Sequence, residues 1–144
     1  MKILIASDHG GLSLKNYLLK EAVSLGTDVE FIDLGAHDEN SVDYPDYAKK
    51  LSQELLNKKA DKGILVCGSG QGMAIQANRF KGIRAALCWD VPSAKLSREH
   101  NNSNVLCLGN RLIPHGLATE IVKVWLQTPF AGGRHEKRTE KLDC

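Results

Sequence analysis

The sequence predicts a doubly wound α/β sandwich with about five parallel strands, because short apolar runs alternate with amphipathic stretches along its whole length. The runs cover residues 2–7, 29–34, 63–67, 83–88 and 104–109. Four of them are nearly unbroken Val, Ile, Leu and Ala, which is typical of parallel strands covered by helices on both faces. A regular strand–helix alternation of this kind favours one parallel sheet between two helical layers.

The stretches between the runs have the spacing of amphipathic helices. The first helix is expected to stop at Gly26, a typical residue after a helix C-terminus, and the second follows Pro45, which suits a first helical turn. A polar helix is expected over Arg134–Leu142. The apolar faces consist of Leu14, Leu18, Ala22 and Leu25 in the first helix, Tyr47, Leu51 and Leu55 in the second, and Leu117, Ile121, Val124 and Trp125 in a later one.

The composition indicates a single globular domain over residues 1–144. A chain of 144 residues lies in the commonest size range for one domain, and 42% hydrophobic and 25% charged residues are ordinary values. Lys and Arg number 19 against 17 Asp and Glu, a formal net charge of +2. This excess is too small to indicate nucleic acid or a membrane surface as the main partner.

The four cysteines indicate a reduced protein, which we expect to be cytoplasmic. Cys67, Cys88 and Cys107 end or interrupt apolar runs, where buried thiols are common, and Cys144 is the last residue. This is not the pattern of a disulfide framework, and no CxxC pair suggests a structural zinc site. The first apolar run stops at Asp8, so we expect neither a secretory signal nor a membrane span.

Polar and glycine residues follow the first predicted strand, at the edge where an open parallel sheet binds its ligands. The sequence there is Ser-Asp-His-Gly-Gly, which places Asp8 and His9 beside a permissive backbone. Asp8 fits equally well as the cap of a helix after a tight turn. Both interpretations stay open on the sequence alone.

A glycine-rich loop, CGSGQG over residues 67–72, follows the third predicted strand. Such a loop lets backbone N–H groups converge on an anion or a developing oxyanion. It matches neither GxGxxG nor a P-loop nor the GxSxG nucleophile elbow. The alternative is a flexible connection, although three glycines in five residues lower stability through backbone entropy. Cys67 before the loop is either a nucleophile or general base, or a buried core thiol.

Two further polar groups carry candidate chemistry. His100, in the sequence SREHNNSN before the fifth run, is a candidate acid or base at neutral pH, or belongs to an ordinary helix end capped by Asn. Arg134 and Arg138 share one face of the expected helix, which suits a phosphate, or they belong to a solvated basic tail. The five histidines show neither an i, i+4 pair nor HExxH, so no metal site is expected.

Five motifs in order carry a resemblance over essentially the whole chain, from residue 1 to about residue 138. They are ASDHGG, SVDYPDYA, CGSGQGMAIQANRFKGIRAALC, SREHNNSNVLCLGNR and GGRHEKR. With them the chain resembles type B ribose-5-phosphate isomerases, in the family that also includes the bacterial galactose-6-phosphate isomerase subunits. The resemblance implies a Rossmann-like three-layer α/β/α sandwich with a five-stranded parallel sheet. It also implies interconversion of ribose 5-phosphate and ribulose 5-phosphate without a metal or cofactor.

The resemblance places the proton transfer at the third strand and its loop. Cys67 matches the general base that takes a proton from C2 and returns it at C1, through a cis-enediolate. Ser69 keeps a hydroxyl that moves protons between O1 and O2. The backbone N–H groups that stabilise the enediolate oxygens belong to the loop with Gly68, Gly70 and Gly72.

The resemblance also implies groups for ring opening and for the phosphate. Asp8 matches a residue that contacts the sugar near its ring oxygen, and His100 matches one that helps to open the furanose ring. Tyr44 and Asn101 stand beside His100. The residues that match the phosphate-binding groups are His9, Arg111, Arg134 and Arg138.

Relatives of this kind form dimers or dimers of dimers with shared active sites, so the resemblance implies a homo-oligomer. It implies that His100, Asn101 and Arg111 come from the neighbouring chain. Cys67 and Met73 place the chain in the cysteine branch of the family, since the other branch has Gly and Glu at these positions. A six-carbon substrate such as allose or galactose 6-phosphate remains an alternative, as does a non-catalytic module that binds a phosphosugar or a nucleotide.

Overall fold

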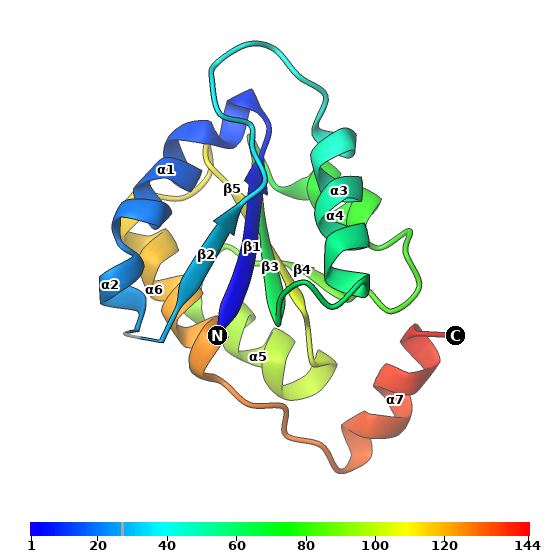
Figure 1. Ribbon diagram of the computed structural model, residues 1–144. Coiled ribbons are helices and arrows are strands. Elements are labelled where there is room, and N and C mark those ends of the chain that lie inside the picture. The colour runs from blue at the N-terminus through cyan, green and yellow to red at the C-terminus, as the bar shows by residue number, and fades with distance from the viewer. Residues whose placement is uncertain (27) are drawn as a thin grey trace.

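The computed structural model describes residues 1–26 and 28–144 and contains a five-stranded sheet (Figure 1). Its strand order is β2-β1-β3-β5-β4, and each of these neighbours runs parallel. Helices lie on both sides, so the predicted three-layer α/β/α fold is confirmed. The strands, each within one or two residues of its predicted run, are β1 Lys2–Ser7, β2 Glu30–Asp33, β3 Lys62–Cys67, β4 Ala85–Leu87 and β5 Val105–Gly109.

Two helical layers cover the sheet, one on each face (Figure 1). Helices α1, α2, α5 and α6 pack on one face, and α3 and α4 pack on the other. Helix α7 lies apart from the sheet and packs beside α5. The bounds are α1 Leu12–Lys20, α2 Ala22–Leu25, α3 Tyr44–Leu56, α4 Gln71–Ala77, α5 Val91–Asn101, α6 His115–Gln127 and α7 Arg134–Leu142, with a 3-10 turn η1 at His9–Gly11.

The first helical segment is divided in two, whereas the apolar spacing predicted one continuous helix. The break is at Glu21, whose carbonyl accepts both the N–H of Ser24 (2.9 Å) and its hydroxyl (2.7 Å). This three-residue spacing tightens the chain and replaces the four-residue bond of an α-helix. The predicted end is confirmed, because α2 ends at Leu25 and Gly26 follows with a φ of 145°.

Alternation along the central strands divides the apolar core into two parts. Ile5 and Val66 face α1, α2, α5 and α6, whereas their neighbours Ala6 and Leu65 face α3 and α4. Side chains of a strand alternate between its faces, so residues two apart point to the same layer. The same alternation decides which layer each residue at the end of a strand faces.

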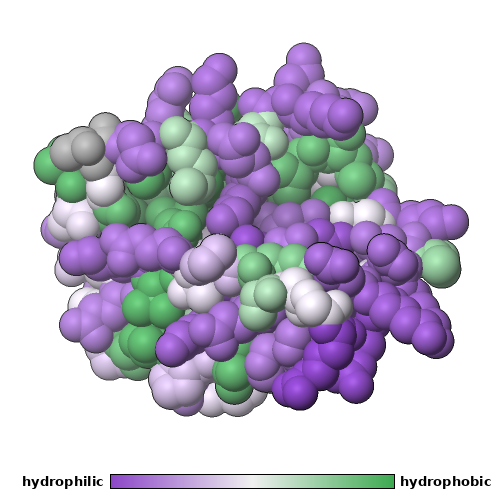
Figure 2. Space-filling view, turned by 90° about the horizontal axis from the view of Figure 1, so that it is seen from below, coloured by the Kyte–Doolittle hydropathy of each residue, from purple (hydrophilic) through white to green (hydrophobic). Residues whose placement is uncertain are grey.

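The surface at the amino ends of the strands is mostly hydrophilic (Figure 2). Apolar side chains form separate patches there, and the most strongly hydrophilic atoms gather on the side where α7 lies in Figure 1. None of the helices within residues 1–26 and 28–144 is long and apolar enough to cross a membrane.

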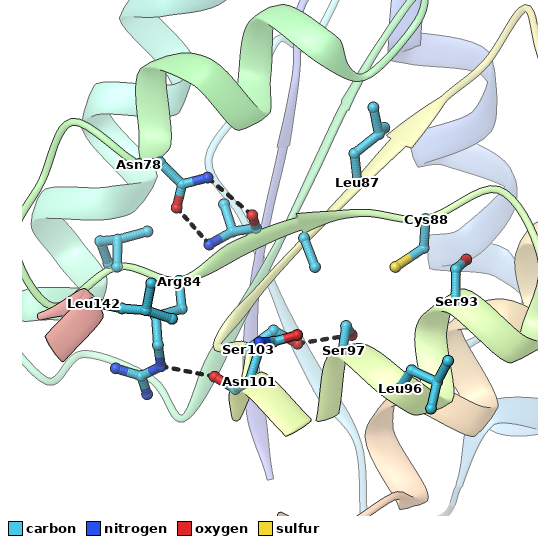
Figure 3. A pocket seen from close by; sticks show the side chains of 13 residues that line it. Asn78, Arg84, Leu87, Cys88, Ser93, Leu96, Ser97, Asn101, Ser103 and Leu142 are labelled. Atoms are coloured by element: carbon cyan, nitrogen blue, oxygen red, sulfur yellow. Dashed lines mark hydrogen bonds between the residues drawn. The ribbon is translucent and has the colours of Figure 1, made fainter. Parts of the chain in front are cut away.

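The outer edge of β4 is met by a side chain instead of a further strand. The amide of Asn78 donates to the carbonyl of Ala85 (2.9 Å) and accepts the N–H of the same residue (2.8 Å), as the two dashed lines in Figure 3 show. These two groups point away from β5, because the neighbouring Arg84 carbonyl accepts from Val105 on the other side. Asn78 thus provides hydrogen-bond partners for the outward-facing N–H and C=O groups of Ala85 on this edge strand.

Lys62, at the start of β3, makes the stability of the fold depend on pH. Its ammonium lies 5.4 Å from the ring centre of Trp125. Burial, and then the charge of Arg98, lower the pKa of Lys62 from 10.5 to about 8, while Asp61 opposes this shift. In the unfolded chain the amine keeps its ordinary pKa, so between about pH 8 and pH 10 the unfolded state binds more protons. Stability therefore rises with pH across this window.

We expect Lys62→Met to remove this rise, because Met has no proton to release on folding. The measurement is the free energy of unfolding in urea at several pH values from about 7 to about 10. Lys49→Met, at an exposed position of α3, is the matched control and should keep the wild-type slope. An unchanged slope in Lys62→Met would show that the amine titrates alike in both states.

Candidate active site

The ends of β1 and β3 place Asp8 and Cys67 side by side. Ser7 pairs with Val66 in the sheet, and the N–H of Asp8 donates to the Val66 carbonyl (3.3 Å). Cys67 belongs to the core beneath α3 and α4. Both residues are nearly buried, with 8% of Asp8 and 5% of Cys67 exposed. A carboxylate and a thiol therefore share one sheltered position at the carboxyl edge of the sheet.

Asp8 caps the turn η1, as one sequence interpretation predicts, and it also lines the cleft at this edge of the sheet. Its carboxylate accepts the N–H of Gly11 (3.0 Å). Gly11 has no side chain because a Cβ there would overlap the Val66 carbonyl. The turn therefore lies directly against β3, and the position of the Asp8 carboxylate is fixed from both sides.

A buried ion pair holds the loop after β2 against the same place. Lys15 of α1 is fully buried, and its ammonium donates to Asp33 (2.7 Å) and to the carbonyl of Ala36. The N–H of Ala36 in turn donates to the carbonyl of Ser7 (2.8 Å). A buried charge is stable only when it is paired, so this pair ties α1 and the loop after β2 to the residue before Asp8.

The glycine-rich loop directs a backbone N–H at the thiol. The N–H of Gly70 donates to Sγ of Cys67 (3.1 Å), and this bond is buried. Gly70 has a φ of 79°, and a Cβ on it would crowd Leu87 and Leu108. Only glycine fits this conformation and this space. An N–H donor at this position stabilises negative charge on the sulfur.

Tyr44 forms one wall of the site. It is the first residue of α3, is 41% exposed, and its ring occupies the space that a Cβ on Gly72 would need. On the other side of the loop, the hydroxyl of Ser69 accepts the N–H of Gln71 (3.3 Å). Gly68, Ser69 and Gly72 of the loop thus line the open space beside Cys67.

These groups surround a cleft of about 380 Å³, which we call the carboxyl-edge cleft. His9 follows Asp8 at an exposed position, where its Nδ1 accepts the N–H of Val42 (3.1 Å). Seven of the predicted site residues line the cleft, and the volume is sufficient for a small phosphorylated sugar. The lining residues are Asp8, Tyr44, Cys67, Gly68, Ser69, Gly72, Arg111 and Leu112.

Arg111 lies in the cleft of its own chain, whereas the resemblance implied that the neighbouring chain supplies it. Its N–H donates to the carbonyl of Gly68 (2.9 Å), and its guanidinium packs over that glycine. The reason is the sheet order, which makes β5 the direct neighbour of β3. The residues after β5 therefore enter the same cleft as Cys67.

Asn110 is a site residue that sequence reasoning left without a role. Its N–H donates to the carbonyl of Cys67 (2.9 Å), and its side-chain amide donates to the carbonyl of Gly10 (2.9 Å). The same amide contacts Ser13 (3.0 Å) and His115 (3.2 Å). Asn110 thus ties together the loops after β1, β3 and β5. The sequence feature that could have identified Asn110 is its position directly after the predicted strand at residues 104–109.

The remaining predicted residues gather at the other end of the sheet. His100 stands near the end of α5, and its ring stacks on that of His135 in α7 at 4.3 Å. Loss of hydration lowers the pKa of His135, and the charges of His100, Arg134 and Arg138 lower it further, whereas Glu99 opposes them. His100, His135, Arg134 and Arg138 therefore form one group of basic side chains, which we call the amino-edge cluster.

Asn101 lines a different cavity from Cys67. This cavity, of about 640 Å³, lies beside β4 and the end of α5 (Figure 3). The helix α5 ends just before β5 begins, so Asn101 and the amino-edge cluster lie near the amino ends of the strands. Cys67 is at the carboxyl end of β3, roughly 16 Å away along five residue steps. One chain therefore does not bring all the predicted site residues together.

The comparisons with known proteins agree with this geometry. The model of the family described as Ribose/Galactose Isomerase matches residues 3–142. The chain belongs to the ribose/galactose isomerase family. The resemblance drawn from its five motifs is thereby confirmed.

Individual members of the ribose/galactose isomerase family are similar over nearly their whole length. A putative sugar phosphate isomerase of Bacillus subtilis is 49% identical over 99% of this chain and 95% of its own. Ribose-5-phosphate isomerase B of Escherichia coli is 43% identical over 98% of this chain and 93% of its own. The crystal structure of a ribose 5-phosphate isomerase of Thermotoga maritima has a TM-score of 0.94 and 52% identity, covering 99% of this chain and 97% of that one.

Proposed function

We propose that this protein interconverts ribose 5-phosphate and ribulose 5-phosphate, with Cys67 as the base that moves the proton. The observation that carries the proposal is the placement of Cys67, nearly buried, with the N–H of Gly70 at its sulfur and Asp8 beside it. Family membership supports the reaction class, and relatives in two bacteria carry the name of this activity. The free cysteines, three of them buried, fit a reducing cytoplasm.

The proton transfer needs a base, a stabiliser of the enediolate and a shuttle between its oxygens. In the proposed mechanism the Cys67 thiolate takes the proton from C2 of the open-chain aldose, and a cis-enediolate forms. The thiol then returns the proton to C1, which gives the ketose. Ser69 moves the hydroxyl proton between O1 and O2, and the backbone of the loop from Gly68 to Gly72 faces the enediolate oxygens.

Ring opening must precede the proton transfer, because ribose 5-phosphate is largely a closed ring. Asp8 lies where it can contact the sugar next to Cys67, and Tyr44 forms the wall beside it. We assign ring opening to His100 with the help of Asp8, and sugar contacts to Tyr44 and Asn101. His100 and Asn101, however, lie at the amino edge of their own chain.

This separation supports an active site shared between two copies of the chain. In the proposed homodimer, or dimer of dimers, His100 and the amino-edge cluster of one copy complete the carboxyl-edge cleft of the other. The phosphate would then lie between His9 and Arg111 of one copy and Arg134 and Arg138 of the other. A two-fold arrangement satisfies both sites at once, because each interface patch occurs twice.

The test is an assay that follows ribulose 5-phosphate formed from ribose 5-phosphate, with EDTA present. Allose 6-phosphate and galactose 6-phosphate are measured beside it at equal concentration. The proposal expects kcat/KM for ribose 5-phosphate to exceed both hexose values by at least about tenfold, the effect of one well-placed polar contact. If kcat/KM is higher for a hexose phosphate than for ribose 5-phosphate, that hexose phosphate is the substrate instead. Substrate binding without turnover of any of the three would identify a binding module.

A further inference from the structure

Arg84 joins two segments that are distant in the sequence. It stands just before β4, with 16% of its side chain exposed, and its Nη1 donates to both carboxylate oxygens of Asp143 (2.8 and 2.7 Å). Its Nε donates to the carbonyls of Asn101 and Asn102 (3.1 Å each). Figure 3 shows the bond to Asn101 as a dashed line. A single guanidinium therefore holds the end of α5 and the residue after α7.

These two segments carry the amino-edge cluster. His100 and Asn101 end α5, and α7 carries the two arginines assigned to the phosphate. Helix α7 lies at the end of the chain, apart from the sheet (Figure 1), and packs beside α5. At its beginning it is held by the His135 stack and by the N–H of Ala131, which donates to the carbonyl of Glu99 (3.1 Å). At its end it is held by Asp143.

The beginning of α7 is rich in basic side chains, so an attractive contact at its other end adds a second attachment. His135 on α7 stacks on His100 of α5, and loss of hydration, followed by the charges of His100, Arg134 and Arg138, lowers the pKa of His135. Glu99 is the acidic group near them. The pair between Arg84 and Asp143 supplies attraction at the opposite end of α7. Because the bond joins two charged groups, it is stronger than a hydrogen bond between neutral groups.

We infer that Arg84 and Asp143 are positioning residues, which set α7 against α5 so that Arg134 and Arg138 meet the substrate phosphate at the correct place. This inference rests on the function proposed above. Neither residue touches the substrate in this scheme. Asp143 acts on α7 alone, whereas Arg84 acts on α7 and on the end of α5 with His100.

The two residues therefore predict different kinetic signatures. Asp143→Asn keeps the shape of the side chain and loses the charge, so α7 loosens and KM for ribose 5-phosphate rises by about three- to fivefold, with kcat unchanged. Arg84→Gln also releases the carbonyls of Asn101 and Asn102, so it raises KM and lowers kcat as well. Asp143→Glu keeps the carboxylate and should stay nearer to the wild-type KM.

The experiment combines steady-state kinetics with hydrogen exchange of the α7 amides on the full-length protein. Glu140→Gln is the matched control, since it removes an α7 carboxylate that forms none of the ion pairs found in residues 1–26 and 28–144. Arg134→Ala is measured in parallel to test the phosphate contact itself. The inference expects faster α7 exchange and a higher KM in Asp143→Asn, and neither change in Glu140→Gln.

Three results overturn the inference, and they can be told apart. Unchanged exchange and KM in Asp143→Asn would show that the pair does not hold α7. Faster exchange with unchanged KM, while Arg134→Ala raises KM, would show that the helix is held for another purpose and would leave the proposed function intact. An unchanged KM in Arg134→Ala would remove the phosphate role of α7, and with it both the inference and that part of the proposed function.

Discussion

Cys67→Ala should fold normally and lose nearly all turnover. The substitution removes one sulfur atom from a nearly buried side chain, so the cleft keeps its shape while the group assigned to the proton transfer at C2 is lost. General base catalysis contributes about 10²- to 10⁴-fold, so kcat should fall by that factor. Cys67→Ser should fall almost as far, because a hydroxyl is a much poorer base than a thiolate near neutral pH. The measurement is kcat for ribose 5-phosphate together with thermal unfolding.

The matched control is Cys107→Ala in β5. Cys107 is also a buried thiol, but it does not line the cleft, so its loss leaves the lining of the cleft unchanged. It should retain most of kcat and lose only stability. A Cys67→Ala variant with near-normal kcat would contradict the assignment of the base. A variant that fails to unfold cooperatively would instead point to a packing role, and Cys67→Ser then decides between the two.

Alkylation separates the cysteines by reactivity. Burial raises the pKa of the Cys107 thiol well above its usual value, with smaller contributions from Cys67 and Cys88, and burial raises the pKa of Cys88 as well. These two should stay protonated and inert toward iodoacetamide near neutral pH. In a Cys144→Ala background, which removes the exposed thiol, modification at Cys67 should inactivate the protein and ribose 5-phosphate should protect it.

Mixing two inactive variants should restore activity. If Cys67 and His100 of one site come from different chains, a dimer of one Cys67→Ala chain and one His100→Ala chain holds one doubly changed site and one intact site. With random exchange about half of the dimers are mixed, so about a quarter of all sites should become active under this symmetry. Native mass spectrometry of tagged chains must show that the exchange has taken place.

The position of Arg111 supplies a sharp control for this experiment. Arg111 lines the same cleft as Cys67 of its own chain, so Cys67→Ala mixed with Arg111→Ala leaves a lesion in every site. This mixture should recover no activity beyond that of Arg111→Ala alone. If the mixture with His100→Ala also stays inactive after proven exchange, the shared site is disproved and each chain must hold its own complete site.

The strands and most helices could be predicted because their signals are local. An unbroken apolar run such as residues 63–67 must be buried on both sides, and periodic leucines require a covered helix face. The sheet order could not be predicted, since each run fits beside any other. β5 lies inside the sheet and β4 at its edge, and the residues of β4 are accordingly less buried than those of β5.

The candidate site was predicted best where it follows the strands. Asp8, Cys67 and the glycine loop each stand directly after an apolar run, and the parallel sheet brings such positions to one edge. Arg111 was expected from the neighbouring chain, whereas it lines the cleft of its own chain, because its place depends on which strand lies beside β3. The bonds of Asn110 and Arg84 join segments far apart in the sequence, and no local spacing signals them.

The two bonds between Asn78 and Ala85 have a consequence for the behaviour of the protein in concentrated solution. A strand at the edge of a sheet offers unpaired N–H and C=O groups to strands of other molecules, and this is a route to aggregation. The side-chain amide of Asn78 has the same donor and acceptor as a peptide group, so it occupies the place that an incoming strand would take. Together with the brevity of β4, this leaves little backbone on that side for strand addition. One asparagine thus helps to keep neighbouring molecules from extending the sheet.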